Sequence, residues 1–175
     1  MQRTKWTDRT FVFDFPEGWL LDILERLRGT GLRIAEMVSS LSEEEAGFKP
    51  GPDKWSMKEH IGHLSDLEEL HDGRIDDFIS GKEMLRPADM SNAKTNQANH
   101  SEKKVEQLIR DFNSKRNKFI SRLEKLDDKT QFFKSMHPRL KTLMRPVDVA
   151  FFAAEHDDHH LASIREMLKQ ISINE

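Results

Sequence analysis

The sequence predicts an all-α protein with the architecture of a four-helix bundle. Glycine and proline are scarce, at 8 and 6 residues of 175, which favours helices over short strands joined by turns. Four long segments repeat apolar residues at intervals of three and four, the period of an amphipathic helix. Long connections separate some of these segments, as in bundles with crossovers. A chain of this length has the size of one ordinary domain, so we expect a single domain over residues 1–175.

The composition excludes several classes of protein and site. Basic and acidic side chains nearly balance, at 28 and 31, with a net charge of -3, so the chain has no basic surface field for nucleic acid. The absence of cysteine excludes disulfides, zinc–thiolate sites and cysteine nucleophiles within this chain. No segment resembles a signal peptide or a membrane span of ~20 apolar residues. We expect a soluble, cytoplasmic protein with no nucleic-acid or membrane partner.

The N-terminal region predicts an extended arm followed by the first helix. Residues 11–15 alternate phenylalanine with Val12 and Asp14, a strand-like pattern that Pro16 ends. Because an isolated strand does not persist alone, we expect this arm to pack on the helices or on a second subunit. From about Pro16 to Ser40 the apolar residues follow the helical period.

Two capping boxes mark the next elements. Ser42 with Glu45 predicts one short helical turn, and Ser56 with Glu59 predicts the start of the second helix. This helix should run to about Ser80. Residues 81–100 are polar and interrupted by proline, so we expect a long crossover with little structure.

The last two helices are predicted by the same signals. Ser101 is a suitable N-cap for a third helix, whose apolar residues extend from Val105 to Leu126. Residues 127–144 form the third connection. Pro146 suits the first turn of a fourth helix, which should extend to about Ile171.

The fourth helix carries a dense group of polar residues, His156 to His160. On a helical wheel His156 and His160 lie within the apolar arc and Asp158 lies opposite, so two imidazoles one turn apart face the core. Such a pair can bind one metal ion, but a tight site needs a third ligand from elsewhere. Helical periodicity does not choose among the three histidines that the second helix offers: His60, His63 and His71.

The histidines also have simpler interpretations. An inward histidine is more often hydrogen-bonded to a carbonyl or carboxylate than bound to metal, so a helical interaction module without metal stays open. His159 lies at the margin of the arc. We expect the neighbouring Glu155 and Asp157 to be solvated. His100 and His137 fall in predicted loops, where we expect structural or exposed roles.

Three further residues stand near the histidines in sequence. Asp66, three residues after His63, is the better candidate for an acceptor that orients an imidazole N–H. Arg74 lies about 20° from His63 on the wheel, so it is a candidate for binding an anionic group of a substrate. It could equally pair with Asp77 or with a carboxylate of another helix. Trp55 is expected only to pack at the helix start.

Two separated blocks resemble the DinB-like (YfiT-like) family of four-helix-bundle proteins. They read KPGPDKWSMKEHIGHLSDLE and FFAAEHDDHHLASI, and are similar to the family's Trp-Ser helix start with a His-Leu pair and to its two ligand histidines four residues apart. By this resemblance the metal ligands are His63, His156 and His160, and the usual ions are zinc or nickel, with iron possible. The resemblance covers nearly the whole chain and implies up-down-down-up topology, a crossover after the second helix and a homodimer.

The resemblance also implies a class of chemistry. Three imidazoles leave a coordination position open, which is typical of catalytic metal sites. We therefore expect a metal-dependent enzyme acting on a small molecule, either a transferase with a low-molecular-weight thiol as cosubstrate or a hydrolase. The alternative is a non-catalytic stress-response or binding protein in which the metal or the histidines are structural. The sequence assigns no catalytic residue such as a general base.

Overall fold

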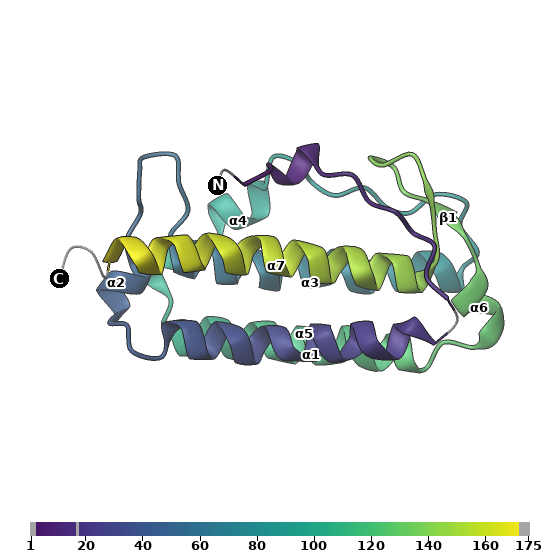
Figure 1. Cartoon of the computed structure of the whole chain (residues 1–175), viewed down its shortest axis with the longest axis horizontal. Helices are drawn as coiled ribbons and strands as arrows, with labels where there is room; N and C mark the ends of the chain where they lie inside the picture. The colour runs from purple at the N-terminus through teal and green to yellow at the C-terminus, as the bar shows by residue number, and fades with distance from the viewer. Residues whose placement is uncertain (1–2, 17, 172–175) are drawn as a thin grey trace.

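The computed structural model describes residues 3–16 and 18–171, and its long helices confirm the all-α prediction. Four helices form the bundle (Figure 1): α1 Trp19–Val38, α3 Met57–Ile79, α5 Val105–Glu124 and α7 Pro146–Ile171. The short helical elements are η1 Trp6–Asp8, α2 Glu43–Gly47, α4 Ala93–Gln97, η2 His100–Glu102 and α6 Asp128–Phe132. None of the helices in these residues has both the length and the apolar character needed to cross a membrane.

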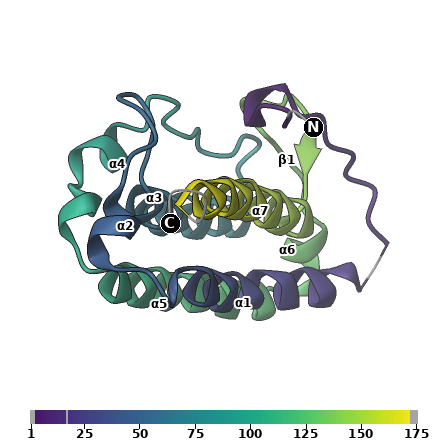
Figure 2. The same cartoon turned by 60° about the vertical axis from the view of Figure 1, so that its left-hand side comes forward.

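The four long helices form two layers, α1 with α5 and α3 with α7 (Figures 1 and 2). One apolar cluster joins Ile34 and Ile164, from the ends of α1 and α7, to the first turns of α3 and α5. A second joins Leu24 and Ala150, from the starts of α1 and α7, to the later turns of α3 and α5. Hence α1 runs parallel to α7 and antiparallel to α3 and α5, which confirms the up-down-down-up topology and the crossover between α3 and α5.

Local signals fixed several helix ends as predicted. Ser42 Oγ accepts the Glu45 N–H at 3.2 Å, and Ser56 Oγ accepts the Glu59 N–H at the same distance. Each glutamate also accepts the backbone N–H of its serine, which completes both capping boxes. Helix α7 spans Pro146–Ile171, the range that the sequence predicts.

The predicted cap of the third long helix is wrong. Ser101 lies inside η2, and α5 begins at Val105 after the extended residue Lys104. The Val105 N–H instead donates to the carboxylate of Glu43, at 3.2 Å from Oε1. A side chain 62 residues away thus satisfies this helix start, and a local pattern could not predict that. The crossover also contains α4, more structure than expected.

The N-terminal arm packs on α7, one of the two arrangements expected. Its Phe11 ring lies 5.1 Å from Phe152, and Phe15 lies 4.7 Å from Phe151. The third connection was expected to be only a loop, but it holds α6 and a hairpin of β1 Ser135–Met136 and β2 Leu143–Met144. Strands of two residues are too short to show a period of two. Arm, crossover and hairpin all lie along the outer side of the α3 and α7 layer (Figures 1 and 2).

Candidate metal centre

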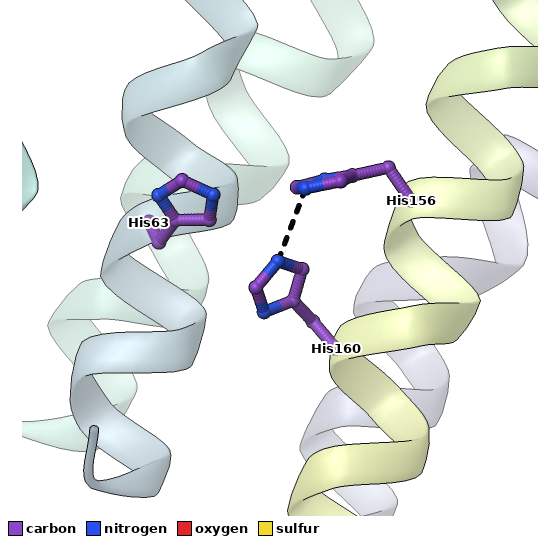
Figure 3. A group of neighbouring side chains, drawn as sticks. All are labelled: His63, His156 and His160. Carbon is purple, nitrogen blue, oxygen red and sulfur yellow. Dashed lines mark hydrogen bonds between the residues drawn. The ribbon is translucent and has the colours of Figure 1, made fainter. Parts of the chain in front are cut away.

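Three imidazoles meet between α3 and α7, and we call them the histidine cluster. His63 comes from α3, and His156 and His160 come from successive turns of α7 (Figure 3). One ring nitrogen of each lies within 4.8 Å of the others. The Nε2 atoms of His156 and His160 are 3.1 Å apart. The structure thus brings together the three histidines that the resemblance singles out.

The donor set of the histidine cluster suits a divalent cation. Two nitrogens bound to one tetrahedral zinc ion lie about 3.3 Å apart, close to the 3.1 Å between the two Nε2 atoms on α7. Burial lowers the pKa of His63 to about 4 and lowers the pKa values of His156 and His160 well below the usual range. The rings are therefore neutral near pH 7, the form that binds metal. Imidazole donors suit zinc, nickel, copper and iron.

A hydrogen-bond chain behind His63 fixes its tautomer. Thr95 Oγ1 lies 3.0 Å from both His63 Nδ1 and Asp66 Oδ2. Burial raises the pKa of Asp66, but hydrogen bonds from His100 and Thr95 more than offset it and leave the carboxyl ionised. Because a carboxylate only accepts, the Thr95 hydroxyl donates to it and must accept from His63 Nδ1–H. His63 Nε2 therefore keeps a free lone pair for the cluster.

Asp66 acts on this chain indirectly. Its hydrogen bonds in the described part of the chain go to Thr95 and to His100 Nε2, the latter at 2.8 Å, so the threonine stands between it and His63. Sequence reasoning missed Thr95 because α4 is a five-residue helix inside the crossover. It also left the environment of His100 open, and this residue is buried. No periodic signal marks either residue.

Replacing Gly62 with alanine is expected to disturb this chain. A Cβ at Gly62 would lie 2.2 Å from Cγ of the buried His100 ring, which Asp66 holds in place. We expect a loss of about 1 to 3 kcal/mol in the free energy of unfolding, measured by urea denaturation, and weaker metal binding. Gly29→Ala is the matched control, because nothing lies within 4 Å of its Cβ position and alanine favours helix. Equal stability of the two variants would contradict the prediction.

The remaining histidines near the cluster have other partners. His60 Nδ1 lies 2.8 Å from His160 Nδ1, so it stands behind His160. Arg3 Nη2 donates to His159 Nδ1 at 3.0 Å and to the His159 carbonyl, which ties His159 to the N-terminal arm. His71 lies eight residues beyond His63 on α3 and lines the adjoining cavity. Helical periodicity did not choose among His60, His63 and His71. The packing of α3 on α7 brings His63 to the two histidines of α7.

Two tryptophan rings pack against the histidine cluster. The Trp55 ring lies 4.6 Å from His63 and 6.0 Å from His160, so it does more than pack at the start of α3. Trp6, in η1 of the arm, lies 4.8 Å from His156. The sequence carried no signal that the arm would return to this point. Both rings thus contact imidazoles of the cluster.

The histidine cluster lies at one end of a cavity of about 490 Å³. The arm, the crossover and the hairpin tip each contribute to its wall, together with α3 and α7. Arg74 lines this cavity and is 1% exposed. It forms no ion pair with Asp77, which instead pairs with Lys82 at 2.8 Å and with Arg86 at 2.9 Å. The cavity gives a small molecule a place beside the imidazoles.

The expectation that Asp157 and Glu155 are solvated is wrong. Asp157 is 1% exposed and binds Arg116, with Nη2 and Oδ1 3.0 Å apart. Glu155 is half-buried and pairs with Arg26 at 2.6 Å. The reason is that α7 packs on both α1 and α3, so its buried surface is wider than a single apolar arc suggests. Asp158, which lies opposite the apolar arc on the helical wheel, also pairs with Arg26.

A sequence profile of the DinB superfamily matches residues 26–164. The chain belongs to this superfamily. The matched region contains the whole histidine cluster. No curated protein matches the sequence of this DinB-superfamily chain.

Solved structures share its fold at low sequence identity. One is YfiT from Bacillus subtilis, a probable metal-dependent hydrolase with an unusual four-helix bundle topology: 14% identity, TM-score 0.80, 94% of each chain covered. Another is the mycothiol-dependent maleylpyruvate isomerase, at 11% identity and a TM-score of 0.66. That match covers 85% of this DinB-superfamily chain and 60% of the isomerase. At such identities the likeness establishes the fold alone.

Proposed function

We propose that this DinB-superfamily protein holds one divalent metal ion with His63, His156 and His160 and catalyses a reaction of a small molecule. The supporting observation is that three neutral, buried imidazoles converge at the end of a cavity. Closed structural zinc sites have four protein ligands, whereas three leave one position for water or substrate. When bound, such an ion acts as a Lewis acid and favours the deprotonated form of a coordinated water or thiol.

The residues around the cluster have separable tasks in this proposal. Thr95 and Asp66 orient His63 so that its Nε2 atom stays available. A metal ion on His160 Nε2 would leave the proton of that ring on Nδ1, which lies 2.8 Å from His60 Nδ1. Trp6 and Trp55 pack against the imidazoles. Without cysteine in the chain, a thiol nucleophile has to arrive as a cosubstrate.

We propose hydrolysis or thiol-dependent transfer as the reaction, with a low-molecular-weight thiol as cosubstrate in the second case. Both fit an open ligand position, and the names of YfiT and the mycothiol-dependent isomerase support metal or thiol chemistry on this fold. Zinc or nickel is the expected ion, and iron is the next choice. A homodimer in the cytoplasm is part of the same proposal.

Metal content tests the ligand set. Protein purified without a histidine tag is expected to contain about one divalent ion per chain, measured by mass spectrometry of the elements. The single variants His63→Ala, His156→Ala and His160→Ala should each reduce the content to background. The control His159→Gln should retain most of it, because this residue lies outside the cluster and contacts Arg3 of the N-terminal arm. Loss of metal in the control but not in His63→Ala would refute the assignment, as would an anomalous-scattering peak elsewhere.

Activity separates catalysis from a structural role for the metal. Loaded wild-type protein and the His160→Ala variant are compared on ester and amide substrates, and on electrophiles supplied with low-molecular-weight thiols. Metal-dependent turnover that the variant lacks supports the enzyme. A stoichiometric ion without turnover on any substrate, together with a lower melting temperature after chelation, supports the non-catalytic binding protein instead.

A further inference from the structure

The wall of the cavity holds polar atoms that the protein leaves unsatisfied. Among the described residues, four buried side-chain nitrogens lack a hydrogen-bond partner, and all four belong to residues that line this one cavity. They are His71 Nδ1, His137 Nε2, Arg139 Nη2 and His156 Nδ1. Buried polar groups normally have partners, so such a concentration points to a ligand. Only His156 belongs to the histidine cluster.

Two of these atoms are donors on the hairpin tip between β1 and β2. The Leu140 backbone N–H donates to His137 Nδ1 at 3.2 Å. Burial lowers the pKa of His137 to about 3, so its ring is neutral and carries its single proton on Nε2. This Nε2–H and the Arg139 Nη2 group are therefore both hydrogen-bond donors without an acceptor.

A buried guanidinium on α3 adds a charge that no carboxylate bonds directly among the described residues, although the nearby Asp77 raises the pKa of Arg74 in part. Arg74 is 1% exposed and donates from Nε and Nη2 to the Arg86 carbonyl at 3.3 Å. No carboxylate pairs with it in the described part of the chain, because Asp77 binds Lys82 and Arg86. Burial lowers the pKa of Arg74 to about 10, so it stays charged near pH 7. A buried charge of this kind is costly until an anion joins it.

These groups share one end of the cavity. His137 and Arg139 both lie against the Phe152 ring, and Arg74 lines the same cavity from α3. Besides burial, the charges of Arg74 and Arg139 lower the pKa of His137. Arg74 lies eleven residues beyond His63 on α3, about 16 Å along the helix axis between their backbones. The carboxylate that lines the cavity, Asp89, is satisfied by its own loop through Ser91 and Ala93.

Apolar side chains separate the two ends of the cavity. Leu67 and Leu70 line it from α3, and Phe152 lines it from α7. The Phe152 ring lies 5.4 Å from His137, and the Arg139 guanidinium lies 5.7 Å from the same ring. A ligand that fills the cavity thus meets donors at one end, apolar surface in the middle and the histidine cluster at the other end.

We propose that Arg74, His137 and Arg139 form an oxyanion-binding subsite, and that the cavity takes a small organic acid. Its carboxylate or phosphate group binds at this subsite, its apolar part lies along the wall, and its reacting group faces the histidine cluster. The placement of the reacting group rests on the proposed function. The subsite itself does not, because none of its three residues belongs to the cluster.

Titration calorimetry of the full chain tests the subsite with inorganic phosphate, acetate and benzoate. Arg139→Gln and Arg74→Met should each weaken binding of the preferred anion about tenfold or more, since each removes a charge-assisted hydrogen bond. Lys141→Asn is the matched control: it removes one charge from the same hairpin tip outside the cavity, and asparagine suits its positive φ of 54°. Benzoate should bind more tightly than acetate, because its ring can lie along the apolar wall of the cavity. Comparing the affinities for phosphate and benzoate shows whether the subsite prefers a phosphate or a carboxylate.

The outcomes separate this inference from the proposed metal site. Anion binding that the arginine variants lose and His160→Ala keeps supports the subsite, whether or not the protein contains metal. Anion binding that His160→Ala loses and Arg139→Gln and Arg74→Met keep overturns it, because the anion then binds at the histidine cluster. Equal weakening by Lys141→Asn, or no saturable binding of any of the three anions, also overturns it.

Discussion

Replacing Arg116 with methionine is expected to lower the free energy of unfolding by about 3 to 5 kcal/mol. Arg116 is 2% exposed in the bundle and binds two buried carboxylates. It donates to Glu68 from Nη2 at 2.6 Å and from Nε at 3.0 Å, and to Asp157 from Nη1 at 2.5 Å. Without the guanidinium, two carboxyl groups would face each other in an apolar environment. Burial already raises the pKa of Glu68, so the variant would have to protonate or hydrate them.

Urea denaturation of two variants on the same helix checks this prediction. Arg122→Met removes an arginine that pairs with Asp72 and Asp76 at the surface, and it should cost about 1 kcal/mol or less. A third protein, in which Arg116, Glu68 and Asp157 all become apolar, should recover most of the stability. We call Arg116, Glu68 and Asp157 the triad. If Arg116→Met lowers the free energy of unfolding no more than Arg122→Met does, the guanidinium of the triad does not stabilise its two buried carboxylates.

The same triad connects the core to the histidine cluster. Asp157 follows His156 on α7, Glu68 lies five residues after His63 on α3, and Arg116 on α5 joins them. Thr30 on α1 also donates to Asp157 at 2.8 Å, so all four long helices meet at this level. The triad therefore fixes how α3 and α7 face each other, on which the spacing of the imidazoles depends. Arg116→Met should weaken metal binding even where the variant remains folded.

Elements with strong local signals were predictable from the sequence. The period of apolar residues, the caps at Ser42 and Ser56, and Pro146 in the first turn of α7 act within a few positions of the chain. The start of α5 was not predictable, because its donor finds Glu43 across the fold. The hairpin at β1 and β2 was missed for a related reason: each strand has two residues and depends on tertiary packing.

In the candidate site, too, residues with a local signal were predictable and residues that only packing brings together were not. The i, i+4 spacing of His156 and His160 placed both on one face of α7, as the structure has them. The third imidazole could not be chosen by period, since the packing of α3 against α7 decides it. Thr95 and Arg139 come from connections without periodicity, and only the folded chain brings them to the cavity. Asp157 was misread because two helices cover α7 where the wheel assumes one.

Acid is expected to destabilise the metal-free protein, and His137 alone should contribute about 3 kcal/mol between pH 6.5 and pH 4. Burial, with Arg74 and Arg139 nearby, lowers the pKa of His137 to about 3 in the folded chain, against 6.5 when unfolded. Below pH 6.5 the unfolded chain therefore binds a proton at His137 that the folded chain does not bind until the pH approaches 3. The contribution of His137 to the free energy of unfolding is fully present above pH 6.5, decreases as the pH falls, and levels off near pH 3.

The slope of stability against pH isolates this contribution from the cost of the substitution itself. His137→Gln should flatten the plot of unfolding free energy by about 1.4 kcal/mol per pH unit between pH 6 and pH 4, measured by urea denaturation with chelator present. Any constant loss of packing shifts the curve without changing its slope. His71 is also buried and its pKa lies well below 6.5, so a slope should remain in the variant. Parallel curves for the two proteins would mean that His137 binds its proton equally well in the folded and the unfolded chain, which would contradict the lowered pKa.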